Sequence, residues 1–82
     1  INASLLAAEE ITSEYQIDFS LLHPLIEETI SKLKESPPSN NQTGPAKRRN
    51  HKIIESHLSM LEDKPILFDI YKIMSEYINS KF

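Results

Sequence analysis

The sequence predicts a small all-α domain. Apolar residues recur at spacings of three and four over most of the chain, which is typical of helices that bury one face. The 82 residues include a single glycine and no alternating run of β-branched residues, so a sheet is disfavoured. A chain of this length has room for one domain that buries only about 60% of its unfolded surface. We therefore expect it to gain stability by packing against a partner.

The pattern predicts four helices, the first over about residues 1–15 and the second over about 19–35. Asp18 or Ser20 is expected to cap the second helix, because both side chains accept backbone hydrogen bonds at helix starts. Pro24 fits a helix that begins at Ser20 or later, since proline is tolerated in a first turn. The expected apolar stripes are Leu5, Ala8, Ile11 and Tyr15 in the first helix and Leu22, Leu25, Ile26, Ile30 and Leu33 in the second.

Residues 36–45 are expected to form a loop, because prolines, asparagines and a Gly-Pro pair interrupt the helical pattern. A third helix is predicted over about 50–62, with Asn50 as its N-cap. The fourth begins at Pro65, a residue suited to the first helical position. The expected apolar stripes are Ile53, Ile54, Leu58 and Leu61 in the third helix, with His57 among them, and Ile66, Leu67, Ile70, Tyr71, Met74, Tyr77 and Ile78 in the fourth.

Charge and composition argue against several classes of partner. The net charge is −3, and the one basic run, residues 47–52, has no second basic stripe beside it, so nucleic-acid binding is not expected. No apolar run approaches the ~18 residues of a membrane span. The chain has no cysteine, which excludes thiolate metal sites, and His51 and His57 are six residues apart instead of the four that a helical metal pair requires. We therefore expect no metal site and no membrane partner.

Few residues are candidates for chemistry. With one glycine, the chain cannot supply a Gly-x-Gly-x-x-Gly fingerprint or a P-loop, so no cofactor is expected to bind this chain alone. His57 lies on an apolar stripe, where a partly buried structural histidine competes with a substrate-binding or acid–base role. The run that follows Thr43 and Gly44 places Arg48 beside a predicted helix N-terminus. That arrangement suits an anion, although a solvated cap without a ligand explains it equally well.

Two motifs resemble a known family. Thr43-Gly44-Pro45-Ala46-Lys47-Arg48-Arg49-Asn50 is followed by His57-Leu58-Ser59-Met60-Leu61. These stretches resemble the C-terminal helical domain of Rossmann-like, NADP-dependent (deazaflavin-type) oxidoreductases, domain of unknown function family 2520, where the motif reads Thr-Gly-Pro-x-x-Arg-Gly-Asp and then His-Leu-x-x-Leu. The segments 7–11 and 22–29 are similar to the first two helices of that domain. The sequence departs from the pattern at Arg49, where the family has glycine, and at Asn50, where it has aspartate.

The resemblance implies a fold like the C-terminal domain of 6-phosphogluconate dehydrogenase, with residues 1–82 serving in dimerisation and bordering the substrate cleft. An N-terminal Rossmann domain of the same chain would bind NADP, and the 82 residues would be inactive alone. The start at Ile1 without methionine fits such a piece of a longer protein. The implied substrate or anion site comprises Thr43, Gly44, Arg48, Asn50 and His57, while no catalytic residue is assigned. A homodimer in the cytoplasm is expected; the alternative is a stand-alone helical protein–protein interaction module.

Overall fold

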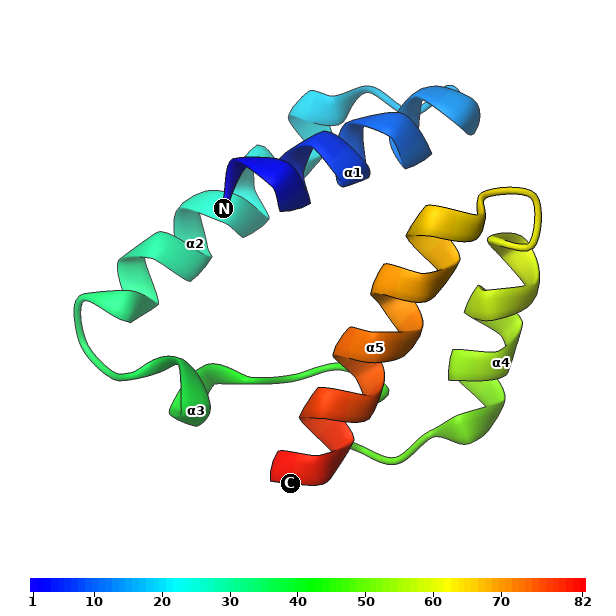
Figure 1. Ribbon diagram of the computed structural model, residues 1–82. Helices are drawn as coiled ribbons and strands as arrows, with labels where there is room; N and C mark the ends of the chain where they lie inside the picture. The colour runs from blue at the N-terminus through cyan, green and yellow to red at the C-terminus, as the bar shows by residue number, and fades with distance from the viewer. The chain divides into compact units, whose positions relative to one another are not determined.

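The computed structural model describes all 82 residues and contains helices, turns and no strand (Figure 1). The all-α prediction is confirmed. The chain divides into two compact units, residues 1–41 and residues 42–82. None of the helices combines the length and the apolar composition that crossing a bilayer requires.

The first unit begins with α1, Asn2–Glu14, as the spacing predicts. This helix ends in a Schellman motif, in which the last carbonyl groups are satisfied by two amides beyond the helix. The Gln16 amide donates to the Ser13 carbonyl oxygen at 3.1 Å, and the Ile17 amide donates to that of Thr12 at 2.8 Å. Closing this pattern places Gln16 in the left-handed region, with φ of 56°.

The second predicted helix is divided in two. Phe19–Leu22 forms a 3-10 turn, η1, and the α-helix proper is α2, His23–Leu33. The Oδ1 atom of Asp18 accepts the Ser20 amide at 2.9 Å, so the aspartate caps η1. The expected start near residue 19 was therefore too early for α2. Pro24 explains the division: it lies at the start of α2, where its missing N–H costs no helical hydrogen bond.

The stretch expected to be loop contains one short helix, α3, Pro38–Asn41. The expectation of loop throughout residues 36–45 was wrong at these four residues. Proline is compatible with a first helical turn, and the turn is closed by side chains: Ser36 Oγ donates to Asn41 Oδ1 at 3.2 Å. Of the five α-helices, the other four correspond to the four that the apolar pattern predicts.

The second unit is a pair of helices, α4, His51–Met60, and α5, Pro65–Lys81. They pack side by side and run in opposite directions, joined by a short turn (Figure 1). Asn50 is the N-cap of α4, and Pro65 lies in the first turn of α5, as predicted. Leu61, which is 9% exposed at the end of α4, and Ala46, which is 4% exposed, are buried in this unit.

Few residues are buried in either unit. Besides Ala46 and Leu61, the threonine Thr12 completes the buried set, and its hydroxyl donates to the Glu9 carbonyl oxygen at 3.1 Å. The predicted apolar stripes exist on the helices, but much of their surface remains exposed, as at Leu25, Ile30, Leu33, Ile66, Ile70, Met74 and Tyr77. Neither unit covers its own apolar faces.

Candidate functional site

The predicted site loop is an ordered turn. Residues 45–49 are in turn conformation, and the Arg49 amide donates to the Ala46 carbonyl oxygen at 3.2 Å. The Asn50 amide donates to the Pro45 carbonyl oxygen at 2.9 Å. These two bonds make a second Schellman motif, which ends one helical turn immediately before α4 begins.

Arg49 lies at the left-handed position of this turn, with φ of 56°. In that region the Cβ atom crowds the following carbonyl oxygen, so glycine is strongly favoured over other residues. The motif that this stretch resembles has glycine at this position, and the backbone provides the physical reason. Gly44 has φ of +100°, and a Cβ atom there would meet no atom within 4 Å. Its requirement for glycine therefore comes from the backbone conformation, not from crowding.

Asn50 joins the turn to α4. Its amide closes the turn, and its Oδ1 atom accepts the amide of Ile53 at 3.3 Å. The predicted role as N-cap is confirmed. An aspartate oxygen can accept the same hydrogen bond, which explains how the family's aspartate and this asparagine can serve one structural purpose. The amide oxygen of Asn50 is thus committed to the start of the helix.

The basic run is divided between packing and solvent. Lys47 Nζ lies 4.9 Å from the centroid of the Phe82 ring, a cation–π contact that ties the turn to the end of α5. Arg48, Arg49 and Lys52 are exposed beside the N-terminus of α4. No sequence pattern indicates the contact with Phe82, because the two residues are far apart in the chain and lie on different elements.

His57 faces the neighbouring helix. Its Nδ1 atom lies 2.6 Å from the hydroxyl oxygen of Tyr71 on α5, and the two rings meet edge to face with centroids 5.5 Å apart. Both side chains are partly buried. This geometry supports the interpretation of His57 as a structural histidine with one hydrogen-bond partner. The partner was not foreseen, although Tyr71 was placed on the apolar stripe of the last helix.

The Tyr71 hydroxyl can serve as the donor in this hydrogen bond. Burial raises the pKa of the Tyr71 hydroxyl above its ordinary value of 10.0, and a hydrogen bond with Ser75 opposes part of this shift. The hydroxyl is protonated at neutral pH and can donate to the Nδ1 atom of His57. In that arrangement the imidazole proton of His57 resides on Nε2.

The predicted site residues fall into two groups. Gly44, Arg48 and Asn50 belong to the turn or its end, and Thr43 precedes it with an exposed side chain. His57 is seven residues after Asn50, or about 10 Å along the helix axis at ~1.5 Å per residue. A small ligand at the turn would not reach a histidine that is held by α5. Four of the five predicted site residues therefore lie at the turn, and His57 lies apart from them beside Tyr71.

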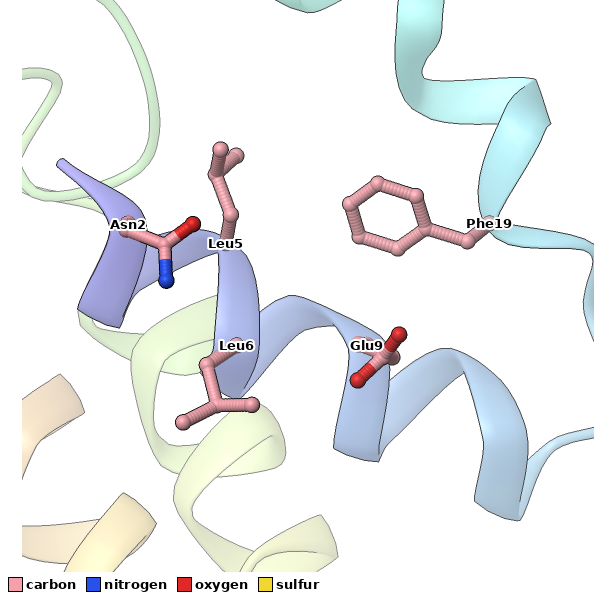
Figure 2. A pocket seen from close by; sticks show the side chains of 5 residues that line it. All are labelled: Asn2, Leu5, Leu6, Glu9 and Phe19. Atoms are coloured by element: carbon pink, nitrogen blue, oxygen red, sulfur yellow. The ribbon is translucent and has the colours of Figure 1, made fainter.

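The structure also has a hollow that the sequence did not indicate. It has a volume of about 260 Å³ and lies between α1 and η1, lined by Asn2, Leu5, Leu6, Glu9 and Phe19. Figure 2 shows the Phe19 ring extending toward Leu5, while Leu6 points away from it. Asn2 and Glu9 are the polar lining residues, and both are exposed. No group of three or more histidine, aspartate or glutamate side chains is placed to hold a metal ion.

Comparisons with known proteins identify one family and one similar solved structure. The family model described as Domain of unknown function (DUF2520) matches residues 1–78. A solved structure from Bacteroides fragilis, described as a "putative NADP oxidoreductase", is 36% identical in sequence and superposes with a TM-score of 0.95. The match covers 99% of this chain but 32% of the other, so the chain spans about a third of the length of that protein. A comparison with curated proteins gave no match.

Proposed function

The chain belongs to the DUF2520 family, and we propose that it is the C-terminal helical domain of an NADP-dependent oxidoreductase. The near-complete superposition on one third of the Bacteroides fragilis protein supports this assignment. The residues of this chain do not themselves fit a dinucleotide site, because the structure has no strand–turn–helix unit and its one glycine lies in the turn before α4. Cofactor binding and hydride transfer are therefore assigned to the rest of a longer, cytoplasmic protein.

Within that protein, the proposed role of this domain is dimerisation. The observation that supports the proposal is the small hydrophobic core. Ala46 and Leu61 are the buried apolar residues, whereas large apolar side chains on α2 and α5 are exposed. Soluble monomers rarely leave such faces uncovered, and contiguous apolar patches usually mark interaction sites. A second subunit and the N-terminal domain of the same chain are the proposed partners.

The proposed contribution to the substrate cleft comes from the turn before α4. Arg48 and Lys52 are exposed there, next to the amide groups of a helix N-terminus. Together they would attract an anionic group such as a carboxylate or a phosphate. In the intact protein, Arg48→Ala is expected to weaken binding of an anionic substrate, with Lys34→Ala as a control that removes a cation from the end of α2.

The proposed function is tested by titrating NADPH into the intact protein and into the 82-residue chain, with nicotinamide fluorescence as the readout. The intact protein should bind NADPH saturably, and the 82-residue chain should not. Absence of binding to the intact protein would contradict the oxidoreductase assignment. Binding by the 82 residues alone would contradict the assignment of the cofactor site to another domain.

A stand-alone helical interaction module is the second candidate. The exposed apolar faces of α2 and α5 favour it as much as they favour a dimerisation domain. The Bacteroides fragilis likeness favours the first proposal, because 36% identity extends over nearly the whole of this chain. Sequencing the gene on the upstream side decides between them: a Gly-x-Gly-x-x-Gly strand–helix unit in the same reading frame excludes the module.

A further inference from the structure

The last helix has two apolar faces. Half-buried Leu67, Tyr71 and Ile78 lie on the face that packs against α4. A second face, the outer stripe, consists of Ile66, Ile70, Ile73, Met74 and Tyr77, and each of these is between 49% and 74% exposed. At 3.6 residues per turn the outer stripe covers about 100° of the helix and is continuous over about three turns.

Polar residues of α5 are segregated from the outer stripe. Asp69, Lys72 and Glu76 lie together on the remaining sector of the helix, and all three are exposed. With apolar residues on two adjacent faces, α5 is polar over only about 100° to 140° of its circumference. A helix that is apolar over so much of its surface is typical of the interior of an assembly, not of its periphery.

The area of the outer stripe is adequate for a symmetric pair. Aromatic side chains present ~150–250 Å² each, and isoleucine and methionine fall toward the lower part of that range. With half to three quarters of each of the five exposed, the stripe amounts to about 600 Å² per copy, or about 1,200 Å² in a pair. Stable specific interfaces begin at about that total.

Charge at the two ends of α5 specifies the direction of pairing. Glu62 and Asp63 are exposed just before the N-cap residue Lys64, and Lys81 is exposed at the C-terminal end of the helix. With Lys64 included, residues 62–64 carry a net charge of −1, and Lys81 carries a positive charge at the other end of the helix. Two copies side by side in the same direction would bring like charges together, whereas two antiparallel copies would bring each acidic end beside a basic one.

We propose that the outer stripe pairs with the outer stripe of a second copy of this chain, with the two α5 helices antiparallel. The pairing rests on the proposed dimerisation role and identifies the surface that performs it. In the register that best aligns the stripes, Ile66 lies opposite the partner's Tyr77, and Ile70 lies opposite the partner's Ile73. The same register brings Lys81 beside the partner's Glu62 and the partner's Asp63. The interface is isologous, so each contact occurs twice.

The first test places a charge in the outer stripe of the intact protein. Ile73→Glu is expected to raise the dimer dissociation constant at least ~100-fold, because the buried residue occurs twice in a two-fold interface. Lys72→Glu, one residue away on the polar sector, is the matched control and should change the constant by less than about threefold. Analytical ultracentrifugation over a concentration series measures both, and NADPH titration of each variant monitors the N-terminal domain separately.

The second test uses the charged ends and does not depend on apolar substitutions. Lys81→Glu alone should weaken the dimer about tenfold, since it replaces four opposite-charge pairs of the two-fold interface by like-charge pairs, and Asp63→Lys alone, which replaces two, should weaken it less. An equimolar mixture of the two variants should associate more tightly than Lys81→Glu alone, because the mixed dimer keeps the wild-type charges at one end and sets the new glutamate beside the new lysine at the other. Parallel pairing predicts instead that Lys81→Glu alone does not weaken the dimer, because one like-charge pair replaces another, and docking of a different surface predicts no change from either variant alone.

The outcomes separate this inference from the proposed function. A monomer at all concentrations, or a dimer that Ile73→Glu does not weaken, overturns the pairing even if NADPH binds normally. If Ile73→Glu impairs NADPH binding while the dimer persists, the outer stripe is covered by the rest of its own chain. That result also overturns the pairing. A dimer that is weakened as expected in a protein without NADPH binding would leave the pairing standing and remove the oxidoreductase assignment.

Discussion

The left-handed turn before α4 offers a test in which neighbouring arginines should respond with opposite sign. Arg49 has φ of 56°, whereas Arg48 does not have a positive φ. A non-glycine residue in the left-handed region costs ~1–2 kcal/mol. Glycine removes this cost but loses ~0.5–1 kcal/mol through its greater freedom in the unfolded chain. Arg49→Gly is therefore expected to stabilise the domain by about 0.5–1 kcal/mol, or ~3–6 °C in Tm for a domain of this size.

Arg48→Gly is the matched control, because it removes the same exposed side chain and the same charge from the adjacent residue. It should destabilise by ~0.5–1 kcal/mol, since glycine at an ordinary helical φ brings only the entropic cost. Arg49→Ala removes the charge but keeps the Cβ atom and should change stability little. Urea unfolding of the protein followed by circular dichroism measures all three variants. If Arg48→Gly and Arg49→Gly shift the midpoint in the same direction, backbone conformation is not the cause.

Individual hydrogen bonds make three further predictions. Asn50→Ala should cost ~1 kcal/mol in urea unfolding, while Asn50→Asp should stay close to wild type, because the carboxylate still caps α4. Tyr71→Phe should cost ~1 kcal/mol at pH 7 by removing the hydrogen bond to His57. Because burial raises the pKa of Tyr71 in the folded state, the stability that this hydroxyl contributes is present below pH 10 and is lost as pH rises through the folded pKa. The urea-unfolding curves of the wild type and of Tyr71→Phe should therefore converge at high pH. The hydrogen bond from the Ser20 amide holds the pKa of Asp18 below its ordinary value of 3.8. The stability that the Asp18 carboxylate contributes is therefore lost as pH falls through the folded pKa. Asp18→Asn should make acid unfolding less steep in that pH range.

Elements whose signals are local could be predicted from the sequence. Asn50 and Pro65 mark helix starts through their own side chains, and the structure places both as expected. The same logic failed at α3 and η1, where short turns compete with a longer helix or a loop and the difference depends on one or two hydrogen bonds. Capping by Asp18 was among the expected possibilities, but the residue caps a 3-10 turn instead of the α-helix itself.

The tertiary contacts of the site could not be predicted in the same way. The bond between His57 and Tyr71 and the contact of Lys47 with Phe82 join residues that are 14 and 35 positions apart. Helical periodicity specifies which face a residue occupies but not which face of another helix it meets. The left-handed backbone conformation at Arg49 also could not be predicted, because arginine has no preference for positive φ. Only the resemblance to a motif that has glycine there provided a signal.

The apolar pattern of the last helix correctly predicted a helix but did not show that the helix has two apolar faces. Ile70, Tyr71, Met74 and Ile78 satisfy one helical periodicity, so they were assigned to one face. In the structure Tyr71 and Ile78 face α4, whereas Ile70 and Met74 remain exposed. A single amphipathic helix needs one covered face, and α5 needs two. Because the outer stripe also needs to be covered, the stability of the domain depends on the partner that covers it. A partner that binds only the folded form stabilises that form by mass action. Stability differences such as that between Arg48→Gly and Arg49→Gly therefore have to be compared at one protein concentration, because association would otherwise contribute to each midpoint.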